Sequence, residues 1–190
     1  MDEVLRCLQL TQLEMLKIFD NFCKSHDLHY SLYAGTLLGA VRHKAFIPWD
    51  DDLDVCMARD EYDRFIALSK KSPCEGYVLQ NKESSPKFTQ SFTKLRKDHT
   101  TFLQSKDEIG KYHTGIFIDI FPIDRIPSGK FSKAFFKWNC MKYQLLTREF
   151  VPTKENLFVR IGSTLILASV PKKRRESVRQ KLLKTITKYA

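Results

Sequence analysis

Apolar residues recur at helical spacing near both ends of the chain. Between residues 3 and 25 they form one broad face, which predicts an amphipathic helix that covers a sheet. The same spacing predicts helices over residues 131–148 and 153–188, with a break at Pro171 in the second segment. A fourth helix is predicted over residues 60–69, because the acidic residues in its first turn complement the helix dipole.

The middle of the chain has the shorter period of β-strands. Residues 52–55 alternate between acidic and apolar side chains and predict one strand. Apolar runs bounded by turn-forming residues predict four more, over residues 28–34, 77–80, 88–96 and 115–122. Strands between terminal helices predict an α+β fold, a mixed sheet with flanking helices and a helical C-terminal part.

The acidic residues of the alternating run are the first candidates for chemistry. Aspartates occupy positions 50, 51, 52 and 54, and the strand period places Asp52 and Asp54 on one face and Asp51 on the other. Two carboxylates held side by side repel each other, and a divalent cation between them removes that repulsion. Because magnesium prefers oxygen ligands and substrate phosphates, the run predicts a metal site.

Other interpretations of this run fit less well. A solvated turn conflicts with the apolar residues at 46–49 and 53–57, which indicate burial. The aspartate-rich box of prenyl diphosphate enzymes requires a helix, whereas Pro48 favours extended backbone before it. The phosphoaspartate motif of haloacid dehalogenases ends an uninterrupted apolar strand, and an EF-hand loop needs a glycine and a glutamate that are missing here. A two-metal site for phosphoryl or nucleotidyl transfer fits best.

One charge, Asp119, lies inside the apolar segment 115–122. A lone carboxylate in such a strand must be ion-paired or bind metal, because burying it alone costs several kcal/mol. We predict that Asp119 is the third catalytic carboxylate, with a buried ion pair as the alternative. Asp124 suits a turn as well as it suits a site.

Two groups of residues are candidates for binding phosphates. Gly35 and Thr36 form a turn in which Thr36 is predicted to cap a helix over residues 37–41, whose free N–H groups suit phosphate. Arg42 and His43 are predicted to reach the same phosphates, although a structural imidazole is equally compatible with the sequence.

Lys94 and Arg96 form the second group. They lie two positions apart on the strand predicted over residues 88–96, so both point to one face and are predicted to bind a nucleotide phosphate. A solvated strand edge is the alternative.

Composition limits the setting. With 190 residues and 43% apolar content, the chain can bury one sizeable core. An odd number of cysteines without Cys-x-x-Cys spacing predicts free thiols. The first residues are acidic where a signal peptide is basic, and the longest uncharged apolar run, residues 161–171, is far shorter than the roughly 20 residues that span a bilayer. These features predict a cytoplasmic protein.

Charge divides the chain into two parts. Residues 1–129 hold 17 Lys and Arg against 19 Asp and Glu, whereas residues 130–190 hold 15 against 3. The division predicts a catalytic core over 1–129 and a basic helical part over 130–190. Without basic-aromatic interleaving, the basic part favours an anionic membrane surface or a polyanionic acceptor over nucleic acid.

Three segments together resemble one known family. Residues 35–43 (GTLLGAVRH), 46–55 (FIPWDDDLDV) and 115–124 (GIFIDIFPID) are similar to motifs of the LicD-type phosphocholine transferases, which also include fukutin-like enzymes. The similarity extends from about residue 30 to 127. It implies a nucleotidyltransferase-like fold, with a glycine-containing helix start, an Asp-x-Asp strand and a third acid on a later strand.

The resemblance also implies a reaction. Asp52, Asp54 and Asp119, with Asp50, would hold magnesium, two ions in all, against the diphosphate of CDP-choline or another CDP-alcohol donor. A hydroxyl of a cell-surface glycan such as lipopolysaccharide or teichoic acid would be the acceptor, with the protein at the inner membrane surface. Asp119 would complete the metal site or act as base. The C-terminal segment usual in this family has no counterpart here, so the alternative is an idle or truncated scaffold that binds donor or membrane.

Overall fold

The computed structural model describes residues 2–88, 90–104, 109–110, 112–148 and 157–188, with side chains for all of these except residues 148 and 157–159. The chain forms two compact units, Met1–Ile123 and Asp124–Ala190, whereas the charge pattern placed the division after residue 129. The first unit contains α1 (Glu3–Ser25), β1 (Ser31–Leu32), α2 (Ala34–His43), β2 (Asp54–Ala58), α3 (Arg59–Lys71), β3 (Tyr77–Gln80), β4 (Thr93–Lys97) and β5 (Phe117–Ile123). The second contains α4 (Lys130–Arg148), α5 (Leu157–Ser169) and α6 (Lys172–Thr187).

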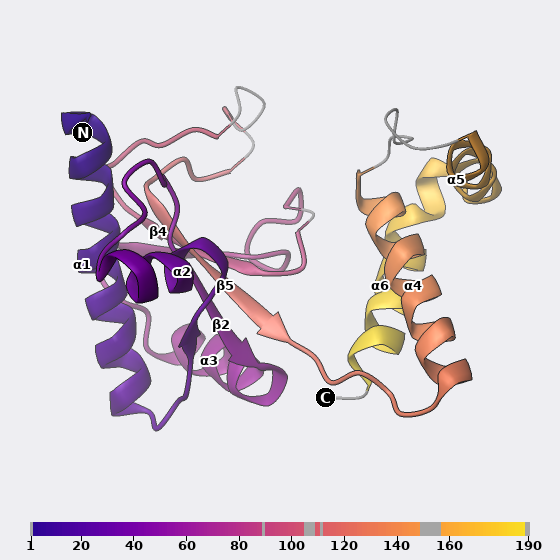
Figure 1. Ribbon diagram of the computed structural model, residues 1–190, viewed down its shortest axis with the longest axis horizontal. Helices are drawn as coiled ribbons and strands as arrows, with labels where there is room; N and C mark the ends of the chain where they lie inside the picture. The colour runs from indigo at the N-terminus through magenta and orange to yellow at the C-terminus, as the bar shows by residue number, and fades with distance from the viewer. Residues whose placement is uncertain (1, 89, 105–108, 111, 149–156, 189–190) are drawn as a thin grey trace. The chain divides into compact units, whose positions relative to one another are not determined.

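Within the described residues, the first unit is built on a five-stranded sheet with the order β1-β2-β5-β4-β3 (Figure 1). The central strands β2 and β5 run parallel, and the other neighbours are antiparallel. A mixed sheet with flanking helices confirms the predicted α+β class.

Helices α1 and α3 cover one face of this sheet (Figure 1). Because side chains alternate along a strand, β2 and β5 send every second residue into this core and the residues between them to the opposite face. The buried core residues on the covered face include Phe19, Phe65, Val55, Ile118, Ile120 and Leu95.

The sequence explains why α1 forms where it does. Asp2 precedes the helix, and its carboxylate accepts a hydrogen bond from the Val4 amide at 3.0 Å, which caps the first turn. Met15, Phe19 and Cys23 follow at intervals of four and bury one face against the sheet. The helix predicted over residues 3–25 is therefore confirmed, as is the helix over 60–69, observed as α3.

The predicted strands differ from the observed ones mainly in length. Residues 77–80 form β3 as predicted, but the strand over 28–34 shrinks to β1, which pairs with β2 through two residues only. The strand over 88–96 begins only at Thr93, because Phe88 and Phe92 pack their rings against each other instead of joining the ladder.

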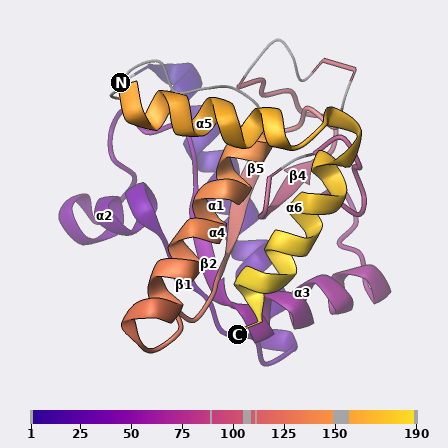
Figure 2. The same ribbon diagram turned by 90° about the vertical axis from the view of Figure 1, so that its right-hand side faces the viewer.

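The second unit is helical, and its helices α4 and α6 lie side by side in opposite directions (Figures 1 and 2). The predicted break at Pro171 is confirmed, while residues 153–156 of the predicted helix lie outside the described residues. Arg175 is buried and donates to the carbonyls of Leu167 (3.2 Å) and Val170 (3.2 Å), where it stabilises the end of α5. None of the described helices combines the length and apolarity needed to cross a bilayer.

Candidate active site

Three neighbouring strands bring charged residues together on the face of the sheet opposite α1 and α3. In the ladder, Asp54 of β2 lies beside Asp119 of β5, and Asp119 lies beside Lys94 of β4. The Asp119 amide also donates to the carbonyl of Leu53 at 2.9 Å, which ties β5 to the residue before β2. Two predicted carboxylates and one predicted cation are therefore adjacent.

Asp119 is part of a buried ion pair. The Lys94 ammonium lies 2.7 Å from Oδ1 and 3.0 Å from Oδ2, and the two residues are 4% and 7% exposed. The same ammonium lies 3.4 Å from the centre of the Phe117 ring. The alternative of an ion pair is thus observed, and the position predicted for a nucleotide phosphate near Lys94 is held by Asp119. Burial raises the pKa of Asp119, and Lys94 opposes this rise.

Asp54 has an unusual proton affinity. Burial raises its pKa from 3.8 to about 7, and repulsion from Asp52, Asp119 and Asp50 adds to the shift. The Lys94 ammonium lowers it only in part. This carboxyl therefore holds a proton more readily near neutral pH than an exposed aspartate does, and a bound cation would favour its ionised form.

The aspartates before β2 complete an acidic cluster, which comprises Asp50, Asp51, Asp52, Asp54 and Asp119. Asp50, Asp51 and Asp52 each place one carboxylate oxygen within 4.8 Å of the other two. The expectation that Asp51 points away is wrong, because the strand begins only at Asp54 and its alternation does not extend to Asp51. Burial raises the pKa of Asp50, and the charges of Asp52 and Asp51 contribute.

Two buried glutamines of α1 hold the backbone of this acidic segment. The Gln9 amide donates to the carbonyls of Asp50 (3.0 Å) and Ile47 (3.3 Å). The Gln12 amide donates to the carbonyl of Asp51 (2.9 Å) and reaches that of Phe117 (3.4 Å). The sequence prediction missed both residues, although two glutamines three positions apart on the apolar face of a helix are a recognisable signal for buried amides.

The start of α2 supports Asp54 in an unexpected way. The helix begins at Ala34 after Tyr33, so Thr36 lies in its first turn and does not cap it. Instead, the Thr36 hydroxyl accepts a hydrogen bond from the Asp54 amide at 2.8 Å. Gly35 lies close to the cluster, since a Cβ there would lie 2.8 Å from Oδ2 of Asp50 and the Asp50 side chain would have to move.

Of the remaining basic candidates, Arg42 and His43 lie away from the acidic cluster, whereas the charge of Arg96 opposes the rise in the pKa of Asp119. Arg42 and His43 are exposed in the last turn of α2, about 9 Å along the helix axis from Thr36. Arg96 is 1% exposed, and its guanidinium donates to Oε1 of Gln80 (2.5 Å) and to the carbonyl of Gly115 (2.8 Å). These contacts assign Arg96 to the packing of the sheet, not to an open groove.

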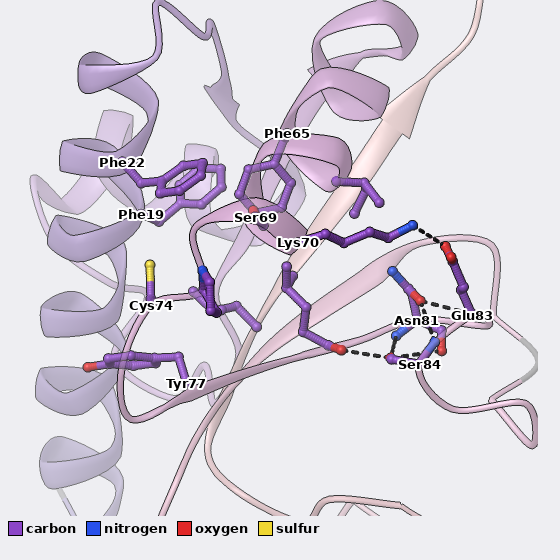
Figure 3. Close-up of a pocket in the computed structure, with 14 residues that line it drawn as sticks. Phe19, Phe22, Phe65, Ser69, Lys70, Cys74, Tyr77, Asn81, Glu83 and Ser84 are labelled. Atoms are coloured by element: carbon purple, nitrogen blue, oxygen red, sulfur yellow. Dashed lines mark hydrogen bonds and ion pairs between the residues drawn. The ribbon is translucent and has the colours of Figure 1, made fainter.

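An apolar cavity of about 340 Å³ lies on the other face of the sheet (Figure 3). Its walls come from α1, α3 and β3, and they include Phe19, Phe65 and Tyr77. Since these side chains belong to the covered face, the cavity is separated from the acidic cluster by the sheet and cannot hold a ligand of that cluster.

The acidic cluster suits a hard divalent cation. All of its ligand atoms are carboxylate oxygens, which magnesium prefers. Burial is the main cause of the raised pKa of Asp54, and repulsion from Asp52, Asp119 and Asp50 adds to it although Lys94 acts in the opposite direction. A divalent cation bound there would offset the repulsion between the carboxylates and could also bind substrate phosphates, which is the arrangement that metal-assisted phosphoryl transfer uses.

Comparisons with known proteins find matches over most of the chain. A family model described as LicD/FKTN/FKRP, nucleotidyltransferase domain, matches residues 27–160. The chain is 38% identical over 125 residues to the lipopolysaccharide cholinephosphotransferase LicD of Haemophilus influenzae, covering 65% of this chain and 46% of that protein. It is 28% identical over 159 residues to an uncharacterised protein of Rickettsia prowazekii, covering 72% of this chain and 58% of that protein. The chain thus spans about half the length of these relatives.

Proposed function

Because the chain belongs to the LicD/FKTN/FKRP nucleotidyltransferase-domain family, we propose that it transfers phosphocholine, or a similar alcohol phosphate, from a CDP-activated donor to a hydroxyl of a glycan. The observation that carries this proposal is the pairing of Asp54 with Asp119 across parallel strands, next to the aspartates before β2. Lipopolysaccharide is the acceptor class suggested by the Haemophilus relative.

In the proposed reaction, the hydroxyl oxygen of the acceptor bonds to the phosphorus that carries choline. The bond between that phosphorus and the bridging oxygen of CMP breaks, and CMP leaves with the electron pair. We assign the proton of the hydroxyl to Asp119, whose burial raises its pKa and so favours proton uptake, while Lys94 fixes its orientation.

The other aspartates have a binding role. Asp50, Asp52 and Asp54 would hold magnesium, which when bound neutralises the diphosphate and stabilises the charge that develops on it. Thr36 fixes the backbone of Asp54, and Gln9 and Gln12 fix the segment that carries Asp50, so these three residues hold the cluster in place.

A second proposal concerns the basic unit. Phe131, Phe135 and Trp138 are exposed at intervals of four and three on α4, so they share one face of the helix. Lys172, Lys173 and Arg174 are exposed at the start of α6. We infer that these groups favour contact with an anionic membrane surface, where rings enter the headgroup region and basic groups lie over phosphates.

Product analysis with labelled donor tests the transfer. The protein is incubated with magnesium, CDP-choline labelled in the choline, and lipopolysaccharide that carries no phosphocholine. We expect the label to enter the lipopolysaccharide while CMP appears in equal amount. Donor binding without CMP release would instead support the idle-scaffold alternative. In a parallel reaction with a second labelled CDP-alcohol, faster transfer than from CDP-choline would show that choline is not the alcohol that the protein prefers.

A further inference from the structure

Partly exposed aromatic rings lie beside the acidic cluster on the same face of the sheet. Phe121 follows Asp119 by two residues on β5, so the strand directs both side chains the same way. The Phe121 ring centre lies 4.5 Å from that of Phe92 and 5.4 Å from that of Tyr33. We call these three residues, Tyr33, Phe121 and Phe92, the aromatic row.

The row is linked to the acidic cluster at both ends. At one end, the Tyr33 amide donates to the carbonyl of Asp54 at 3.0 Å, and the Tyr33 side chain is 42% exposed. At the other end, the Phe92 ring centre lies 5.4 Å from the ammonium of Lys94, the partner of Asp119. The Phe121 and Phe92 rings are half-buried, so part of their apolar surface remains available to a ligand.

Lys94 shows that ring faces on this side of the sheet accept a cationic group. Its ammonium lies 3.4 Å from the centre of the Phe117 ring and 5.4 Å from that of the Phe92 ring. Because Asp119 pairs with this ammonium and the other aspartates are assigned to magnesium, the rings are the groups left for a second cation. Aromatic ring faces of this kind recognise quaternary ammonium ligands.

We propose that the aromatic row forms the subsite for the quaternary ammonium of the donor, so that it selects choline over other alcohols. The inference rests on the proposed function and narrows the donor class within it. A trimethylammonium group cannot donate hydrogen bonds, so aromatic ring faces are the groups suited to hold it. A primary ammonium keeps its hydration more strongly and gains less from ring faces, and an uncharged polyol has no charge for the rings to attract.

Calorimetry on ring-to-leucine variants tests this subsite. Wild type, Tyr33→Leu, Phe92→Leu and Phe121→Leu are titrated with CDP-choline, CDP-ethanolamine and CMP in the presence of magnesium. We expect wild type to prefer CDP-choline, and each leucine variant to bind it about 2- to 30-fold more weakly with CMP affinity unchanged. Tyr33→Phe keeps the ring and should keep the preference. Phe22→Leu, which removes a half-buried ring on the opposite face, is the matched control.

The outcomes separate the subsite from the function. Retention of the choline preference by all three leucine variants overturns the subsite, as does equal binding of CDP-choline and CDP-ethanolamine by wild type. An equal loss of CMP affinity in the variants shows that the rings act only through packing, which also overturns it. If folded wild type binds neither donor, the proposed function fails and this inference fails with it.

Discussion

Asparagine in place of either of two facing aspartates should change stability in opposite directions. Asp119→Asn leaves the Lys94 ammonium, which is 4% exposed, without its carboxylate partner. Removing one partner of a buried ion pair costs about 3–5 kcal/mol, and we expect the lower end because the Phe117 ring still contacts the ammonium.

Asp54→Asn should instead stabilise the metal-free protein. The folded-state pKa of Asp54 is about 7, above its ordinary value of 3.8, so the folded protein binds more protons than the unfolded chain between these values. Its contribution to stability is therefore present below pH 4 and is lost as pH rises through 7. The full difference corresponds to roughly 4 kcal/mol, which we reduce to about 1–2 kcal/mol because the half-buried carboxylate is screened by solvent.

Hydrogen exchange of β5 amides, measured with EDTA at pH 5 and pH 8, reads the first unit alone. Both effects should appear as changes in the opening free energy of β5, with the gain from Asp54→Asn present at pH 8 and small at pH 5. Asp27→Asn is the control, because this exposed residue has φ 51° and asparagine tolerates that backbone. Equal destabilisation by both variants, or a gain from Asp54→Asn that does not depend on pH, would refute the reasoning.

Three further predictions concern Thr36, Gly35 and the basic start of α6. Thr36→Val removes the acceptor of the Asp54 amide and should cost about 1–3 kcal/mol of opening free energy in β2, measured by hydrogen exchange; no change would show that another group replaces the hydroxyl. Gly35→Ala places a methyl group 2.8 Å from Oδ2 of Asp50 and should weaken magnesium binding in calorimetry while the thermal midpoint changes little, whereas unchanged affinity would show that the Asp50 side chain moves aside without loss of the metal. Changing Lys172, Lys173 and Arg174 to Gln should release the protein from anionic vesicles at low salt, since each contributes about 1 kcal/mol near such a surface and the attraction is screened over about 10 Å at 0.1 M salt. Arg175 is kept in this variant because it caps α5, and equal partitioning of wild type and variant would contradict the membrane proposal.

Local periodicity predicted much of the fold. Helix α1 follows directly from spacing, because its apolar face repeats over 23 residues. Helix α3 follows from the acidic residues of its first turn, and β3 follows from an apolar run bounded by turn-forming residues. The short strand β1 and the late start of β4 depend on pairing partners that are distant in sequence. No local pattern near Phe88 indicates that its ring packs against Phe92.

The candidate site likewise combines residues that the sequence predicted with contacts that it could not predict. Asp52, Asp54 and Asp119 were identified from their setting among apolar residues, and the structure brings Asp54 and Asp119 into register. The partner of Asp119 could not be identified from sequence, because the ion pair requires β4 to lie next to β5 in the sheet although residues 98–116 separate the two strands along the chain. The hydrogen bond from Asp54 to Thr36 likewise depends on where α2 begins.

Donor binding tests the central claim most directly. Wild type, Asp52→Asn and Asp54→Asn are titrated calorimetrically with CDP-choline, with magnesium and again with EDTA. We predict that wild type binds the donor only with magnesium and that each variant binds at least about 10²-fold more weakly, since each loses a carboxylate positioned for the metal and its phosphates. Donor binding that is equal in EDTA, or unchanged in Asp54→Asn, would contradict the assignment of this cluster as the metal and donor site.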